Sequence, residues 1–412
     1  MTRYEKYKPS SVEWIGEIPA HWKIKRLKYS ALIKYGLGQP PKQKDDGLPL
    51  IRATNIERGK IVDKGLVFID PDDVPYDRDP VLKEHDIIVV RSGAYTADSA
   101  LIPKKYEGAI TGYDMVVRAI EENPIFIAYC LLSDYVLVKQ LYLNKLRAAQ
   151  PHLNKEELGD TLLLLPLKDE QPAIAAYLDD KTAQIDKLIA NKQKLIDLLK
   201  EERTAIINQA VTKGINPNAK LKPSGIEWLG DIPVHWEVKK LKYVLRINSG
   251  DGIKSENIHF EGSYPVYGGN GILGYTEDYS SDKSDIIIGR VGAKCGNVRL
   301  VEGKKWISDN ALRVTTFEGY DLQYVAILLD AMNLNSLANQ NAQPLITGTM
   351  VKERLTILPP TIEEQIKIVK FVEISEDKIG TTISKIEQEI DLLKEYRTAL
   401  ISEVVTGKVK VF

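Results

Sequence analysis

The sequence predicts an α+β protein in which two mixed α/β globular regions are joined by two long helices that pair antiparallel as a coiled coil, giving an internal pseudo-two-fold repeat. Three observations support this fold class. A long stretch with helical periodicity occurs twice, a second duplicated stretch precedes each globular region, and each region contains strand-like runs followed by helix-like runs. The order along the chain is therefore leader, globular region and long helix, repeated once.

The helical duplication sets the predicted boundaries. An offset of 194 residues aligns Gln171 with Gln365 and Thr212 with Thr406, and the run Asp-Leu-Leu-Lys-Glu-x-Arg-Thr-Ala occurs in both copies. The expected segments are globular regions and long helices in alternation, at residues 1–165, 166–216, 217–357 and 358–412.

Apolar residues in both copies recur at alternating steps of three and four, the 3.5-residue period of a coiled-coil seam. A helix over about residues 171–212 would be roughly 60 Å long and cannot bury such a stripe alone, so the other copy is the expected partner. The predicted seam positions are Ile185, Ile189, Ile196, Leu199, Arg203 and Ile206 in the first copy, and Ile379, Ile383, Ile386, Ile390, Leu393, Arg397 and Leu400 in the second.

Arg203 and Arg397 occupy the same seam position. A charge inside a seam costs stability and can fix register or partner choice. Alternatively, both arginines extend along the helix to the edge of the seam and keep their charges in water. The sequence leaves both interpretations open.

Composition is that of a soluble protein, with 43% hydrophobic and 27% charged residues. No apolar run approaches the ~20 residues of a membrane span, and the N-terminus has no apolar signal-peptide core, so we expect a cytoplasmic protein. Cys130 and Cys295 stand alone, which argues against a zinc or disulfide framework. The net charge of −1 includes no strongly basic segment, so any DNA contact must come from a local arrangement.

The leader at residues 8–29 returns at residues 222–243 with the same aromatic, proline and histidine positions. It ends in a basic cluster that includes Lys25, Arg26 and Lys240. This cluster is either a grip on phosphate or a solvated helix face. The two leader histidines, His21 and His235, are expected to be structural turn residues.

The two globular regions share a short β-branched run ending in Arg-x-Gly. It begins at Asp86 and reaches Arg91 in the first region, and it begins at Asp285 and reaches Arg290 in the second. We predict a buried strand whose terminal arginine reaches a base edge or a phosphate; an ordinary surface turn has the same pattern. Amphipathic helices are expected after Glu121 and after Asp321.

Loops rich in glycine, amides and tyrosine supply further candidates, because they can bring the backbone close to a ligand or pair with base edges; amides also cap turns. The candidate DNA-binding residues are Lys25, Arg26, Gly38, Gln39, Arg52, Asn55, Arg91, Ser92, Gln150, His152, Asn154, Lys240, Tyr267, Asn270, Arg290, Lys294, Asn339, Asn341 and Gln343.

Enzyme signatures are missing from the sequence. There is no Asn/Asp-Pro-Pro-aromatic tetrapeptide, glycine-rich dinucleotide turn, Walker A sequence or His-Glu-x-x-His. An acidic-x-Lys triplet at residues 302–304 is of a kind that occurs by chance in any charged chain. We therefore expect no catalytic residues and no bound metal, and a chain built to bind at two places.

The combination of these motifs resembles the DNA-specificity (S) subunit of Type I restriction-modification enzymes. The resemblance covers nearly the whole chain: the leader Pro-x-x-Trp, the Asp-Ile-Ile…Arg-x-Gly strands, the Gln-Pro pairs at Gln150 and Gln343, and the Leu-Pro-x-x-x-x-Gln-type start of each long helix. One departure is the turn before Gln171, which is one residue shorter than the turn before Gln365.

This resemblance implies that each globular region is a target-recognition domain reading one half of a split double-stranded DNA sequence, with the antiparallel helices as a ruler of at most about 18 base pairs. It also implies that two methyltransferase (M) subunits dock mainly on the helices and carry S-adenosylmethionine. Motor-nuclease (R) subunits with ATP and magnesium would cut. This chain would then be non-catalytic and bind no cofactor or membrane.

Two other functions stay open from the sequence. One is a coiled-coil scaffold that binds proteins through two variable domains, which the near-neutral charge favours. The other is a self-sufficient nuclease or methyltransferase with an unrecognised site.

Overall fold

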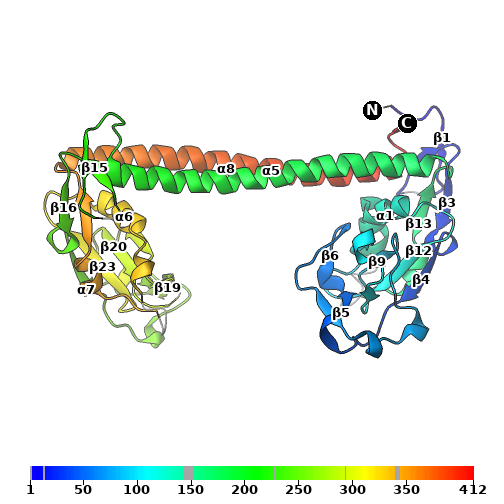
Figure 1. The fold of residues 1–412 in the computed structure, drawn as a ribbon, viewed down its shortest axis with the longest axis horizontal. Helices are drawn as coiled ribbons and strands as arrows, with labels where there is room; N and C mark the ends of the chain where they lie inside the picture. The colour runs from blue at the N-terminus through cyan, green and yellow to red at the C-terminus, as the bar shows by residue number, and fades with distance from the viewer. Residues whose placement is uncertain (1, 13, 143–151, 227–228, 293, 339–343) are drawn as a thin grey trace. The chain divides into compact units, whose positions relative to one another are not determined.

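The computed structural model describes residues 2–12, 14–142, 152–226, 229–292, 294–338 and 344–412. The chain forms two compact units (Figure 1). Unit 1 comprises Met1–Lys192 with Glu387–Phe412, and unit 2 comprises Gln193–Ile386. Each unit thus contains one globular region and a part of both long helices, and the four-segment description of the chain stays a prediction.

Unit 1 is built around a four-stranded antiparallel sheet of order β10-β9-β12-β4, beside a three-stranded sheet of order β11-β5-β8. Short strand pairs β1-β2, β6-β7 and β13-β3 complete it. The strands are β1 Tyr7–Pro9, β2 Glu17–Pro19, β3 Lys23–Arg26, β4 Ala31–Tyr35, β5 Gln43–Ile51, β6 Ile56–Glu57, β7 Lys60–Ile61, β8 Val67–Ile69, β9 Ile87–Val89, β10 Ser99–Leu101, β11 Ile110–Thr111, β12 Met115–Ala119 and β13 Leu162–Leu165.

The helices of unit 1 are short except for its share of the long ones. The 3-10 turns are η1 Leu27–Tyr29, η2 Ala53–Asn55, η3 Pro71–Asp73, η4 Tyr76–Arg78 and η5 Lys104–Tyr106, and the other helices are α1 Pro124–Leu132, α2 Asp134–Val136, the π-helix η6 Leu137–Leu141 and α4 Lys155–Gly159.

Unit 2 repeats this plan with sheets of order β17-β23-β20-β21 and β19-β18-β22. Its elements are β14 Leu221–Pro223, β15 Asp231–Pro233, β16 Glu237–Lys240, η7 Leu241–Tyr243, β17 Leu245–Ser249, η8 Ser255–Asn257, β18 Tyr264–Gly268, β19 Gly271–Thr276, β20 Asp285–Gly289, β21 Val298–Val301, β22 Trp306–Ile307, β23 Ala311–Thr316, α6 Leu322–Ala331, η9 Leu334–Leu337, α7 Gly348–Lys352 and β24 Leu355–Leu358.

The predicted β-branched runs are the central strands of both units. In β9, Ile87 and Val89 belong to the core that includes α1, whereas Ile88 belongs to a second core on the opposite face. In β20, Ile286 and Ile287 divide between two cores in the same way. Successive side chains of a strand point to opposite faces, so a strand buried on both sides requires an unbroken apolar run.

The first aspartate of each run holds an arginine of the neighbouring strand. Both carboxylate oxygens of Asp86 accept bonds from Arg118, each at 2.7 Å. Asp285 is fully buried beside Lys305 and Arg313, at 3.2 and 2.7 Å. Burial alone would raise the pKa of Asp285, but hydrogen bonds from Ser281, Arg313 and Lys305 outweigh it and lower that pKa. The motif therefore begins with a structural ion pair.

The helices expected after the strands are shorter than predicted. Asn123 caps α1 by accepting a bond from the Phe126 N–H at 3.0 Å, but the helix ends at Leu132 and a new start at Asp134 follows. Among the described residues, no single helix is long and apolar enough to span a membrane; only the bent pair of α1 with the helical residues up to Leu141 meets that test together. Those α1 residues are mostly buried in the core of unit 1.

The two long helices are α5, Glu170–Lys213, and α8, Ile362–Val405, each of 44 residues. The observed α5 begins one residue before and ends one residue after the predicted helix. Within unit 1, Asp186 of α5 lies 3.2 Å from Arg397 of α8, and Lys192 pairs with Glu389. Rising numbers on one helix meet falling numbers on the other, so the two segments are antiparallel there.

Burial follows the predicted seam at every apolar position. Ile185 packs in the core of unit 1 with Leu400, and Ile196, Ile379, Ile386 and Ile390 are also buried. The remaining apolar seam positions are half-buried: Ile189, Leu199, Ile206, Ile383 and Leu393.

The two seam arginines differ. The side chain of Arg397 is 18% exposed beside Asp186, whereas that of Arg203 is 53% exposed and pairs with Glu376. Arg203 therefore extends to the edge of the seam, as the second interpretation predicted, and still pairs with the other long helix. The long side chain lets the charge reach water and a carboxylate, which avoids the cost of burial.

A buried glutamine fastens the start of each long helix to its globular region. The Gln171 side-chain oxygen accepts the Asn123 N–H at 2.7 Å, and its amide donates to Glu122 at 2.6 Å. The Gln365 oxygen likewise accepts the Asp321 N–H at 2.8 Å. Both amides are at most 1% exposed, so the repeated glutamine is a structural joint.

We expect Gln171→Ala to lower the free energy of unfolding of unit 1 by about 1–3 kcal/mol, because it leaves the Asn123 N–H without its acceptor and removes one donor from the Glu122 carboxylate. Denaturant unfolding and hydrogen exchange at the start of α5 measure this. The matched control is Gln184→Ala, since this exposed amide bonds Asp180 and Lys181 of its own helix. Equal effects of the two substitutions would contradict the assigned joint.

Candidate nucleic-acid interface

In unit 1, three strand ends bring one arginine and two tyrosines together. Met115 of β12 is paired with both Tyr35 at the end of β4 and Val89 at the end of β9. Arg91 follows β9 by two residues, and Tyr113 precedes β12 by two. The register of this sheet thus brings Tyr35, Arg91 and Tyr113 close together, although they are far apart in the sequence.

The Arg91 guanidinium lies between two tyrosine rings. Its central carbon is 4.3 Å from the centroid of Tyr35 and 4.6 Å from that of Tyr113. The two rings are 39% and 44% exposed, so the stack lies at the surface. The backbone N–H of Arg91 donates to the Asp114 carboxylate at 3.1 Å. Burial raises the pKa of Asp114, against the effect of the hydrogen bonds it accepts from Arg91 and Ala53.

Further candidates surround this stack. Ser92 forms an antiparallel bridge with His152, and the Leu153 N–H donates to the Arg91 carbonyl at 2.8 Å. Arg52 also comes close, because a Cβ on Gly112 would lie 3.3 Å from its Cγ. The structure therefore brings Arg91, Ser92 and His152 together, whereas the Arg52 guanidinium donates to the Gly65 carbonyl at 2.8 Å.

Unit 2 has the same turn with different neighbours. Arg290 follows β20, and its Nη1 donates to the Ser249 Oγ and to the Asp309 carbonyl, each at 3.3 Å. Ser249 ends β17 as Tyr35 ends β4. Val291 bridges to Leu345 as Ser92 does to His152. The scaffold is shared, and the side chains presented on it are not.

The β18–β19 hairpin passes directly against this turn. A Cβ on Gly269 would lie 2.8 Å from the Asn310 carbonyl and 3.5 Å from the Arg290 nitrogen. Asn270 is exposed at the hairpin tip, followed by Ile272 and Leu273, which are 51% and 50% exposed. The hairpin thus presents an amide and two apolar side chains next to Arg290.

Comparison with known proteins bears on this arrangement. The family model described as Type I restriction modification DNA specificity domain matches residues 23–199 and 233–392. The chain belongs to this family of DNA-specificity subunits.

Individual relatives agree. The specificity subunit of the type I restriction enzyme EcoprrI from Escherichia coli is 35% identical over 154 residues, 36% of this chain and 37% of that one. The putative MjaX specificity subunit of Methanocaldococcus jannaschii is 26% identical over 96% of both chains.

Solved structures show the same fold. A chain from a structure described as "Structural basis underlying complex assembly and conformational transition of the type I R-M system" has a TM-score of 0.74 at 19% identity, over 95% of this chain and 99% of that chain. The HsdS subunit from Thermoanaerobacter tengcongensis has a TM-score of 0.56 at 19% identity, over 95% and 98%.

Several predicted DNA contacts of this specificity subunit have internal roles. Asn55 is fully buried, accepts the Arg52 N–H, and donates to the carbonyls of Val62 and Lys64, so its assignment as a DNA contact was wrong. The Asn154 side chain caps α4 by accepting the Glu157 N–H at 2.8 Å, which is the capping alternative.

The basic leader clusters lie on strands, so the helix-face alternative was wrong. Lys25 lies 3.5 Å from Glu122 and Arg26 lies 2.9 Å from Asp160. Lys240 pairs with Glu353 at 2.7 Å. The side chains of Lys25, Arg26 and Lys240 therefore each already face a carboxylate.

Other candidates keep open positions. Gly38 and Gln39 are exposed, and Gly38 has ordinary backbone angles with open space around it. Lys294 is exposed in the turn after Gly292, while Tyr267 is half-buried against the core below β18. The four remaining candidates lie outside the described residues: Gln150, Asn339, Asn341 and Gln343.

The glycine of the Arg-x-Gly motif has a conformational cause. Gly93 has φ +91° and Gly292 has φ +83°, a region that residues with a Cβ rarely adopt.

Tyr35 and Tyr113 were missed by sequence reasoning. The one available signal was a tyrosine flanking glycine, at Tyr35-Gly36 and Gly112-Tyr113.

Each leader histidine contacts a carboxylate at the start of a long helix. His21 Nε2 lies 3.0 Å from Glu170, and His235 Nε2 lies 3.1 Å from Glu364. Because each pair joins the leader turn to a helix end, a structural role accounts for both. Within the described part of the chain, no three His, Cys, Asp or Glu side chains converge as a metal site would require.

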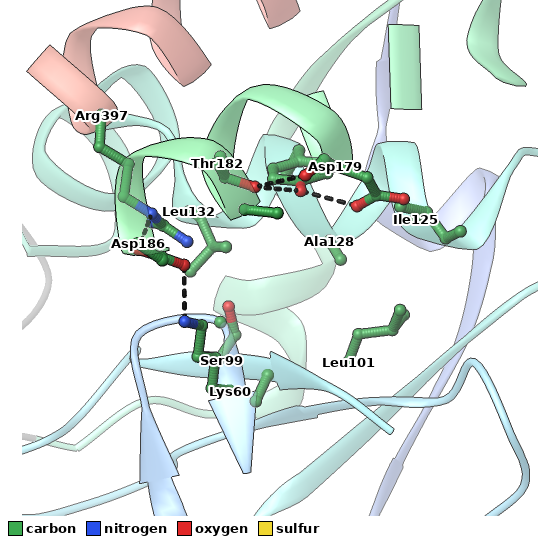
Figure 2. Close-up of a pocket in the computed structure, with 14 residues that line it drawn as sticks. Lys60, Ser99, Leu101, Ile125, Ala128, Leu132, Asp179, Thr182, Asp186 and Arg397 are labelled. Atoms are coloured by element: carbon green, nitrogen blue, oxygen red, sulfur yellow. Dashed lines mark hydrogen bonds and ion pairs between the residues drawn. The ribbon is translucent and has the colours of Figure 1, made fainter. Parts of the chain in front are cut away.

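A cavity of about 440 Å³ lies between α1, α5 and the β6–β7 hairpin of unit 1 (Figure 2). Its charges face each other: Asp186 lies 2.6 Å from Lys60 and 3.2 Å from Arg397. The Tyr129 hydroxyl donates to Asp179 at 2.7 Å. Because these groups are already paired, the cavity is a joint between elements of the specificity subunit rather than a ligand site.

We expect Gly36→Ala to disrupt the tyrosine–arginine stack. The new Cβ would lie 2.0 Å from the Gly112 carbonyl, forcing Tyr35 and Tyr113 apart, at a cost of about 1–3 kcal/mol in the free energy of unfolding. Thermal unfolding and DNA binding measure this. Gly38→Ala, where nothing lies within 4 Å, is the control and should change stability by less than about 0.5 kcal/mol. A harmless Gly36→Ala would contradict the close approach.

Proposed function

We propose that this chain gives a type I restriction-modification complex its bipartite DNA target, with unit 1 reading one half and unit 2 the other. One observation carries the proposal. Arg91 and Arg290 occupy the same turn of the same sheet, but tyrosines flank the first while Ser249 and Asp309 accept bonds from the second. A shared scaffold with different presented side chains suits two different short sequences.

The long helices serve in this proposal as the spacer between the two half-sites, paired antiparallel along their length as a coiled coil. The opposed numbering of the contacts in unit 1 and the Arg203–Glu376 pair in unit 2 support it. The buried Gln171 and Gln365 would then transmit a fixed helix orientation to each globular region.

Two methyltransferase subunits are the proposed partners on the helices. Leu198 and Leu392 occupy the same position of the repeated Asp-Leu-Leu-Lys-Glu run and are 50% and 63% exposed. The next residues, Leu199 and Leu393, face the seam, so packing does not explain the exposed leucines. One such leucine lies in each unit, which suits two copies of one partner.

The chemistry belongs to the partners in this proposal. The methyltransferase subunits would bind S-adenosylmethionine, and motor-nuclease subunits would use ATP and magnesium. This chain would determine which DNA sequence the complex recognises, and double-stranded DNA would be its ligand.

Modified-base maps of the host genome with the gene intact and deleted test the bipartite function. We expect deletion to remove one split, asymmetric methylated motif, because each half depends on a different unit. An unchanged map in cells that express the methyltransferase would favour the protein-binding scaffold, whose DNA binding would be absent or insensitive to salt.

The double variant Leu198→Glu/Leu392→Glu tests the docking surface. We expect its affinity for the methyltransferase to fall at least about tenfold, since charges would enter an apolar contact, while the fold is retained. Titration with purified methyltransferase measures this. Leu195→Glu is the control: this leucine is 45% exposed, and the other copy has Glu389 at that position. Equal losses in both proteins would contradict a specific site.

A further inference from the structure

We propose that unit 1 reads a guanine in the major groove through Arg91, with Tyr35 and Tyr113 as positioning residues that hold its guanidinium in plane. This inference rests on the proposed function, and it names the base that one unit recognises.

The Arg91 guanidinium has two ring neighbours and, in the part of the chain that the structure describes, no hydrogen-bond acceptor. The ring centroids of Tyr35 and Tyr113 lie 4.3 and 4.6 Å from its central carbon, and such stacking limits the orientations that a planar guanidinium can take. Its Nε is buried without a hydrogen-bond partner, and among the described residues no carboxylate forms an ion pair with it. The terminal N–H groups are therefore the donors left for a ligand.

Two other arginines show what a guanidinium with internal acceptors looks like in these sheets. Arg118, also in the central sheet of unit 1, gives two 2.7 Å bonds to Asp86. Arg290, on the equivalent turn of unit 2, donates to Ser249 and to the Asp309 carbonyl. In unit 1, Tyr35 takes the position of Ser249. Its ring packs on the Arg91 guanidinium and does not accept the terminal N–H groups, so these remain available to a ligand.

Guanine fits these donors best among the bases. Its O6 and N7 are adjacent acceptors that match two parallel N–H groups, whereas adenine places a donor beside N7 and cytosine presents a donor. A phosphate also accepts from arginine, but it requires no fixed plane, and contacts to phosphate carry no sequence information. Clamping the side chain costs conformational freedom, which a directional contact offsets and a phosphate contact does not need.

The experiment uses the complete complex of this chain with its methyltransferase subunits, on duplexes containing the mapped target. Each guanine of both halves is replaced in turn by 7-deazaguanine, which lacks the N7 acceptor. We expect one position, in one half only, to reduce wild-type affinity about 5- to 150-fold. Arg91→Ala should lose a similar factor and become insensitive to 7-deazaguanine at that position.

The clamp has its own readout. Tyr113→Leu should reduce the preference for guanine over adenine at that position more than it reduces overall affinity, and Tyr113→Phe should restore the preference because it keeps the ring. Arg58→Ala, an exposed arginine of unit 1, is the control for removal of charge. Assembly with the methyltransferase shows that each variant is folded.

Three results would overturn the inference: a unit 1 half-site without guanine, no guanine whose 7-deaza replacement acts through Arg91, or an Arg91→Ala variant that weakens all sequences equally and lowers the salt dependence by about one charge. The last result would identify a phosphate contact. In each case a split methylated motif still exists, so these outcomes differ from failure of the proposed function, in which no such motif is lost on deletion.

Discussion

The buried amide at the start of each long helix is the interaction on which the rest depends. Gln171 links α5 to the start of α1 through the Asn123 N–H, and Gln365 links α8 to the start of α6 through the Asp321 N–H. A helix joined only by a loop could pivot about its first residue. With this bond in its first turn, each long helix is fixed at its start to its own globular region.

The presented surface of each unit is built on this frame from strand ends. The central strands are buried on both faces, so their side chains are committed to packing. Beyond the last buried residue the chain is free to present other groups, and both units use the same point, one turn after β9 and β20. The family match and the solved structures are consistent with one scaffold used twice.

Sequence predicted most of the frame and less of the surface. The first long helix was predicted to within one residue at each end, because a 3.5-residue period sustained over residues 185–206 is a strong signal. The central strands β9 and β20 followed from short β-branched runs. Asn55 was misassigned because a polar residue in a loop pattern looks exposed, whereas the η2 turn buries it and uses all its bonds.

The stack around Arg91 could not be predicted for a different reason. Tyr35 and Tyr113 are 78 residues apart, and only the register of Met115 with Tyr35 and Val89 brings them to the same arginine. Local pattern carries no information on strand register across such a distance. The ion pairs of Lys25 and Arg26 were likewise invisible, since their carboxylates come from distant segments.

The position of the arginine turn also bears on how such proteins diversify. Arg91 and Arg290 stand outside the packed cores, next to residues such as Tyr35 and Ser249 that end a strand without filling the interior. Substitutions there change what is presented to a ligand and leave the packed volume intact. The target of one unit can therefore change by substitution at these positions, with little effect on folding stability or on the target of the other unit.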